Sequence, residues 1–230
     1  PLGRSWIDAT YFLGKVMNDR VPALATVGGS GIEGAPGVSV LHGNERLDRP
    51  FRSGLRVDFG TWLDRCQNWG IDASFFYMES SRITLETAST GSPLLARPFT
   101  AEPGDMASAL TLASAGSTRG SLFVTSPVSF LGADVNSRHT LFCEDRTRLD
   151  ILAGYRFIRM AESITIHSRT EGSAGAAQDL NDTFSAVNLF NGAQVGITGE
   201  YRWERLYVAG TGKAAIGINW YRLDIDGSTR

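Results

Sequence analysis

Alternation of apolar and polar residues is the strongest pattern in this chain. From Phe51 to Asp64, the odd positions are mostly apolar, as at Val57, and the even positions are mostly charged or glycine, as at Arg56. Successive side chains of a strand point to opposite faces, so this segment predicts a strand with one apolar and one charged face. Its length exceeds the usual strand of about 5–6 residues. It is sufficient to cross a bilayer at a tilt, which takes about 9–11 residues.

Six further segments alternate in the same way, although the first and fourth do so more weakly. The seven predicted strands are Trp6–Lys15, Phe51–Asp64, Trp69–Tyr77, Leu122–Arg138, Leu149–Glu162, Ala193–Tyr201 and Leu206–Ile218. The fourth contains Pro127, at which a strand is expected to bend or break.

The connections between these segments alternate in length. Long connections cover about 16–50, 84–120 and 163–188, and short turns lie near 64–68, 139–147 and 203–205. Short periplasmic turns and longer external loops are typical of outer-membrane barrels. We therefore predict an all-β fold, an antiparallel up-and-down transmembrane β-barrel, as a single domain over 1–230 with these three segments as long external loops.

The alternation assigns each side chain to one side of the barrel wall. The charged positions predicted to face the lumen are Arg52, Arg56, Asp58, Asp72, Asp134, Arg138, Asp150, Arg156, Glu162, Glu200 and Lys213. The apolar positions predicted to face lipid are Leu55, Val57, Phe59, Phe75, Val195, Ile197, Leu206 and Val208. Buried charges need partners, so the mixture of signs predicts pairing across a narrow lumen. Trp69 and Trp203, at strand ends on the apolar side, suit a membrane–water boundary.

Composition and charge argue against several other classes of protein for this chain. The chain is 42% hydrophobic with a formal net charge of -2, which provides no strong field to attract nucleic acid. No apolar run approaches the roughly 18 residues of a spanning helix. Cys66 and Cys143 fall in two neighbouring turns on the predicted periplasmic side, and this compartment is oxidising. A disulfide between them and two free thiols both remain open.

No motif in the chain predicts catalysis, a cofactor or a metal. Gly29–Gly34 matches G-x-G-x-x-G, but Pro36 follows closely and forbids the helix that a dinucleotide site needs. His42, His139 and His167 lack zinc-ligand spacing. No G-x-S-x-G is present. An outer-membrane hydrolase with catalytic groups at the barrel rim stays as the third hypothesis.

Four stretches and one glycine-rich segment carry a resemblance to a known family. They are Phe59–Phe76, Ser89–Phe99, Leu149–Phe157, Gly192–Gly217 and the loop Gly28–Gly43. The chain resembles the BBP-type outer-membrane β-barrel family of planctomycetes, and the resemblance extends over nearly its whole length. It implies a porin-like membrane protein of the cell envelope, located in the cell outer membrane, and brings no catalytic residues. Because family members continue past the position of Asp226 to Ser228, we expect further strands beyond Arg230 and an open edge at Trp6–Lys15.

The leading hypothesis is an outer-membrane barrel with a structural, anchoring or narrow-pore role. Its expected partners are outer-membrane lipids and the barrel assembly machinery. Barrels of about eight strands are filled by side chains, whereas wide pores need about sixteen. The alternative is a soluble β-barrel or sandwich that binds an apolar ligand on its inward apolar faces. Strand parity alone does not separate the two, but strand length, strand-end tryptophans and loop asymmetry favour the membrane.

Overall fold

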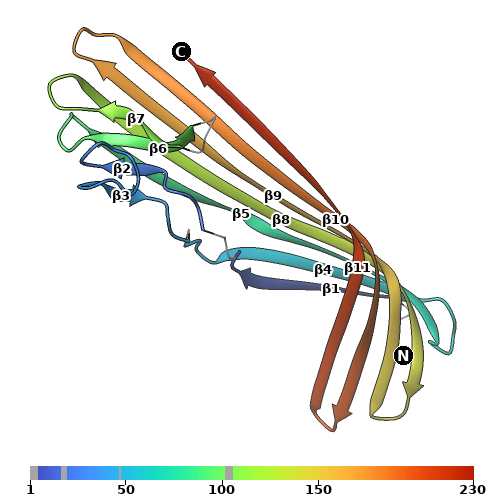
Figure 1. Ribbon diagram of the computed structural model, residues 1–230. Helices are drawn as coiled ribbons and strands as arrows, with labels where there is room; N and C mark the ends of the chain where they lie inside the picture. Colours follow the sequence, from blue (N-terminus) through green and yellow to red (C-terminus); the bar gives the residue numbers. More distant parts are fainter. Residues whose placement is uncertain (1–4, 17–19, 47, 102–105) are drawn as a thin grey trace.

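The computed structural model describes residues 5–16, 20–46, 48–101 and 106–230, and it is built from β-strands (Figure 1). The strands are β1 (Ser5–Gly14), β2 (Ala25–Val27), β3 (Ser39–His42), β4 (Arg52–Trp62), β5 (Trp69–Ser89), β6 (Leu95–Ala101), β7 (Met106–Ala113), β8 (Thr118–Cys143), β9 (Thr147–Gly172), β10 (Ala177–Trp203) and β11 (Leu206–Thr229). Within these ranges no helix is long and apolar enough to cross a membrane.

Seven strands form one long antiparallel sheet in the order β1-β4-β5-β8-β9-β10-β11. Each of them contains all or most of one segment predicted from the alternation. Strand β1 pairs with β4 alone and β11 with β10 alone, so among the described residues the sheet is open and does not close into a barrel. The position of β1 at an edge agrees with the expectation for Trp6–Lys15.

Five strands, β5 and β8 to β11, are far longer than predicted, and the prediction of a long loop over 163–188 is wrong. Strand β9 continues to Gly172 and β10 starts at Ala177, so only a tight turn separates them. Beyond Glu162 the odd positions of β9 become polar, at Thr165 and His167, while the even positions Ile164 and Ile166 are apolar. The two halves of the strand therefore follow opposite patterns, which hid its continuation. Pro127 also lies within β8 and does not end it.

The other two predicted loops contain a second sheet with the order β3-β2-β6-β7. This small sheet packs on one face of the long sheet. Their shared core consists of Val21, Leu24, Ala25, Leu95, Leu112 and Ala113 from the small-sheet side and Leu122, Val124 and Ile166 from β8 and β9. In Figure 1 the small sheet lies over one end of the long strands. We call this end the cap end and the opposite end, with the turns at 63–68, 144–146 and 204–205, the turn end.

Buried Arg49 also connects the small-sheet segment to the long sheet. The residue is 1% exposed, and its guanidinium donates hydrogen bonds to the carbonyl oxygens of Ser81 on β5 and Ser126 on β8, and to the Ser126 hydroxyl. A buried charge is costly without such partners. These bonds therefore hold the chain that leads into β4 against the face on which the small sheet packs.

Candidate functional site: an ion-paired interior at the turn end

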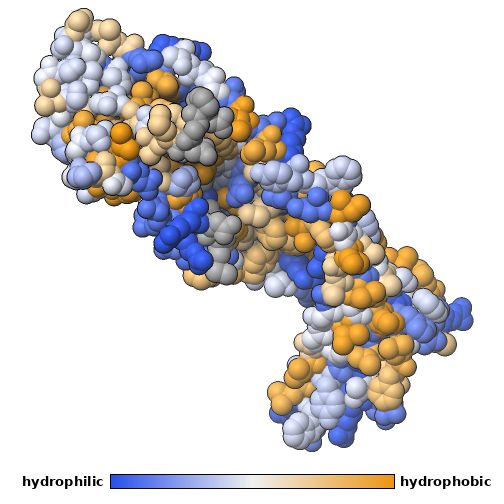
Figure 2. Space-filling view, in the orientation of Figure 1, coloured by the Kyte–Doolittle hydropathy of each residue, from blue (hydrophilic) through white to orange (hydrophobic). Residues whose placement is uncertain are grey.

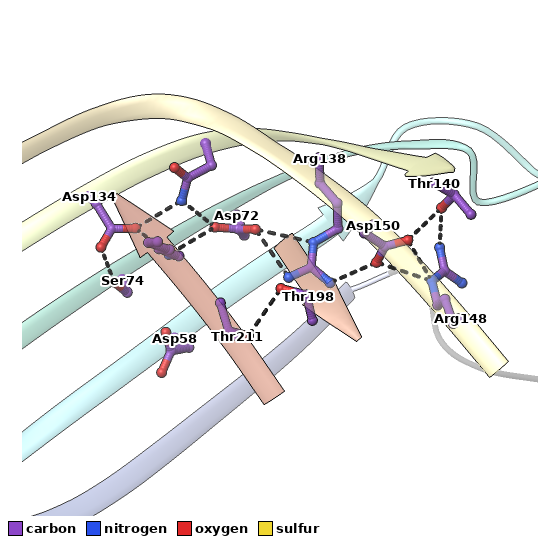
Figure 3. A network of polar contacts seen from close by, with 12 residues as sticks. Asp58, Asp72, Ser74, Asp134, Arg138, Thr140, Arg148, Asp150, Thr198 and Thr211 are labelled. Atoms are coloured by element: carbon purple, nitrogen blue, oxygen red, sulfur yellow. Dashed lines mark hydrogen bonds and ion pairs between the residues drawn. The ribbon is translucent and has the colours of Figure 1, made fainter. Parts of the chain in front are cut away.

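The face of the long sheet that carries the small sheet at the cap end is charged at the turn end; we call it the inner face. The register aligns Asp72 of β5 with Asn136 of β8, and Asp134 of β8 with Arg156 of β9. The side chains of Asp72, Asp134 and Asn136 are all buried. Figure 3 shows Asp72 and Asp134 among polar side chains that converge from several strands.

The contact of Lys213 on β11 with carboxylates on distant strands is the strongest geometric evidence that the long sheet is curled. Its Nζ lies 2.7 Å from Oδ1 of Asp134 on β8 and 4.0 Å from Oδ1 of Asp72 on β5. Three strands separate β5 from β11 in the sheet. In a flat sheet this separation would be about 19 Å, since neighbouring strands lie about 4.8 Å apart. The sheet is therefore strongly curled, its inner face is concave, and side chains from both ends of the curl meet.

Two arginines extend this contact to the other edge of the sheet. The guanidinium of Arg138 on β8 binds Asp72 and Asp150 at 3.1 and 3.2 Å. It also lies 5.1 Å from the ring centre of Trp6 on β1. The guanidinium of Arg148 on β9 lies 4.1 Å from the ring centre of Trp62 on β4. Arginine over an indole face is a favourable cation–π contact. Side chains from β1 to β11 thus occupy the concave space at the turn end.

Each buried carboxylate in this cluster has several partners. Asp134 accepts hydrogen bonds from Ser74 at 2.8 Å, Asn136 at 2.8 Å, Arg156 at 3.1 Å and Lys213 at 2.7 Å. The Asp150 carboxylate, 1% exposed, accepts bonds from Arg138, Arg148 and Thr140. Carboxylates bound by so many fixed donors are held in place rather than free to bind a solute. Among the described residues, no group of three His, Cys, Asp or Glu side chains could hold a metal ion.

The structure brings most of the predicted inner charges together. Asp72, Asp134, Arg138, Asp150, Arg156 and Lys213 form the connected cluster. Arg56 and Asp58 pair with each other beside it on β4, with Nε to Oδ2 at 2.8 Å.

Arg52, Glu162 and Glu200 share the inner face by register but lie outside the cluster. Glu162 lines a cavity of about 340 Å³ with Phe184 and Leu223, towards the cap end. At the turn end, Glu200 lies 3.5 Å from Arg202.

Several members of the cluster were not singled out from the sequence. Arg148, which binds Asp150, lies just outside a predicted strand. Asn136 and Gln194 are uncharged, and the Gln194 amide donates a hydrogen bond to the Asn136 side-chain oxygen. The role of Trp62 as a cation–π partner depends on the curl. Strand parity carries a usable signal for two of them: Arg148 shares its parity with Asp150, and Trp62 shares its parity with Asp58.

The opposite face, here called the outer face, is apolar at the turn end. The predicted lipid-facing residues that are exposed on it are Leu55, Phe59, Phe75, Val195, Ile197, Leu206 and Val208. Val57 on the same face is half-buried. In Figure 2 hydrophobic residues gather over the turn-end half of the sheet. Cys66, in the turn at 63–68, and Cys143, the last residue of β8, are both free and exposed, so the predicted position of Cys143 in a turn is wrong.

Comparison with known proteins gives one family. Residues 6–230 match the model of the family described as "Putative beta barrel porin-7 (BBP7)". No curated protein and no solved structure matches the chain.

Proposed function

Because this chain belongs to the beta barrel porin-7 family, we propose that it is an outer-membrane β-barrel that serves as an anchor, with at most a narrow passage through its interior. The family supports a membrane barrel without catalytic activity. The proposed role as an anchor with a filled interior depends on the inner face. The single observation that supports it is the contact of Lys213 with Asp134.

That contact supports a filled interior because it joins strands that a wide channel would keep apart. Wide porins of 16–18 strands leave an aqueous channel, whereas barrels of about eight strands are filled by side chains. Here Arg138 reaches Trp6 from one side while Lys213 reaches Asp72 from the other. These contacts favour a packed, ion-paired interior over a broad water-filled lumen.

The outer face supports lipid as the partner of the turn end. Large apolar side chains there are bare, including Ile216 at 83% exposed and Val195 at 61%. Exposed apolar area of this extent marks an interaction surface. A soluble barrel that binds an apolar ligand would bury these side chains inside, but the concave face holds charges instead. On this proposal the barrel assembly machinery inserts the protein and lipids cover this face.

Membrane insertion is tested by expressing the protein with an export signal and fractionating the envelope. We expect the protein in the outer membrane, extracted only by detergent, with different gel migration before and after boiling. A protein that remains soluble without detergent would refute the membrane role.

The filled interior is tested by conductance in planar bilayers. We expect no large, stable steps for the unmodified protein. Arg138→Ala with Arg148→Ala should raise the conductance, whereas Arg222→Ala, on an exposed pair of β11, should not. Heat-modifiable migration of each variant shows that it is folded. Large porin-like steps from the unmodified protein would contradict the anchor role while leaving the barrel intact.

A further inference from the structure

The outer face consists of lateral rows of aligned residues, and the rows of the turn-end half are mostly apolar. The register across β5, β8, β9, β10 and β11 places these rows as Ala73–Val135–Tyr155–Ala193–Ile216, Phe75–Ala133–Phe157–Asn191–Ile218 and Tyr77–Leu131–Arg159–Leu189–Trp220. The last row is the only one of the three with a charged residue, and two of its five members are Tyr and Trp.

Towards the cap end, the same face becomes polar. The corresponding rows are Thr84–Thr125–Thr165–Thr183–Asp226 and Glu86–Phe123–His167–Asn181–Ser228. The Thr165 and Thr183 hydroxyls are 3.3 Å apart. His167 lies 3.6 Å from Asp179, and Arg169 lies 3.0 Å from Glu171. A surface of hydroxyls, amides and ion pairs suits water, and it would be costly in hydrocarbon.

At the same level along the strands, the inner face changes from charged to apolar. Near the turn end it is charged, whereas at the cap end Leu122, Val124 and Ile166 are buried against the small sheet. Strand β5 takes part through a bulge between Met78 and Ser81, which shifts its inward positions from even to odd. An extra residue in one strand has this effect. The cap-end half therefore has the pattern of a water-soluble protein, with an apolar interior and a polar exterior.

The height of the apolar half matches a bilayer. From Trp69 to Tyr77, β5 spans about nine residues, compared with the about 9–11 that a transmembrane strand needs. Strand β10 has 27 residues, far more than one crossing requires. Aromatic and arginine side chains such as those of Trp220 and Arg159 favour the headgroup level.

We propose that the bilayer covers only the turn-end half of the outer face, up to the row of Arg159, and that the cap-end half stands in water outside the membrane. This inference rests on the proposed membrane role, and it adds the position on the outer face at which the membrane ends. The partner surface is thus a lipid band bounded by Trp69 at one level and by Tyr77, Arg159 and Trp220 at the other.

Site-specific fluorescence quenching tests this boundary. Single cysteines are introduced by Tyr155→Cys and His167→Cys, two exposed outer-face positions of β9, in a background of Cys66→Ser and Cys143→Ser. Ile216→Cys and Asp226→Cys form a second pair on β11. Each variant carries an environment-sensitive nitrobenzoxadiazole label and is reconstituted into phosphatidylcholine vesicles, with or without bromine on the acyl chains.

We expect brominated lipid to quench the labels at 155 and 216 at least threefold more than those at 167 and 226. Equal, strong quenching at all four positions would overturn the boundary and leave the membrane role standing. No quenching at any position would refute the membrane role itself. Heat-modifiable migration confirms that each labelled variant is folded.

Discussion

The indole ring of Trp6 on β1 lies directly over Gly60 on β4. A Cβ atom added at Gly60 would lie 1.9 Å from Cζ2 of the indole, much closer than atoms can approach. The same ring lies 5.6 Å from the ring of Trp62 and contacts Arg138. Glycine is therefore needed at position 60 to leave room for an aromatic side chain that helps fill the concave face.

Gly60→Ala should destabilise the protein by about 1–3 kcal/mol, because the displaced indole must push against a packed neighbour. Gly210→Ala on β11 is the matched control, since a Cβ there meets nothing within 4 Å. Thermal unfolding in detergent, followed by circular dichroism, measures both. Equal melting temperatures for the two variants would show that the ring moves aside without cost.

The Lys213–Asp134 ion pair should be essential for folding stability. Both side chains are at least nine-tenths buried, and removing one partner of a buried pair costs about 3–5 kcal/mol. Lys213→Met is therefore expected to unfold at a clearly lower denaturant concentration. Arg222→Met breaks an exposed pair with Asp224 on the same strand and should change stability little. Adding Asp134→Asn to Lys213→Met should recover part of the lost stability. If the stability losses of the two single variants simply add in the double variant, the two side chains are not directly coupled.

Arg49 should hold the small sheet in place. Arg49→Met removes three hydrogen bonds to Ser81 and Ser126 and leaves buried acceptors with fewer partners, at a cost of about 1–3 kcal/mol. We expect limited proteolysis to cut within 20–46 several-fold faster, while the long strands stay intact. Arg46→Met, at an exposed position of the same segment, is the control. Unchanged cleavage in Arg49→Met would mean that the apolar core alone retains the small sheet.

Asp64 should make the turn between β4 and β5 sensitive to acid. Its carboxylate accepts hydrogen bonds from the backbone N–H groups of Trp69 and Asn68, which lower the pKa of Asp64 below its ordinary value. A lowered folded-state pKa gives stability that is present above the unfolded value, about 3.9, and is lost as the pH falls through the folded value.

Asp64→Asn should therefore reduce the melting temperature near neutral pH. It should also make the melting temperature fall less between neutral pH and about pH 3. Asp145→Asn, in the exposed turn between β8 and β9, is the matched control. Thermal unfolding at both pH values provides the comparison. If Asp64→Asn and the unmodified protein lose the same stability on acidification, the turn bonds do not depend on the carboxylate charge.

The amino-acid sequence by itself determined the strands near the turn end and the parity of their faces. Alternation at Val57 and Asp58, or at Val195 and Gln194, reports directly which side chains share a face, because a strand repeats every two residues. The sequence also placed Cys66 and Cys143 near the same end of the strands, although Cys143 belongs to β8 itself. These features depend only on neighbours along the chain.

Only the tertiary structure decided which charges meet and where the pattern inverts. Lys213 reaches Asp134 because the sheet is curled, and curl is a property of several strands together. The continuation of β9 past Glu162 was hidden because Ile164 and Ile166 are apolar on a face that is charged nearer the turn end. Their burial depends on the small sheet, whose strands come from segments distant in the chain. A residue's environment is set by what covers it, and local alternation alone does not contain that information.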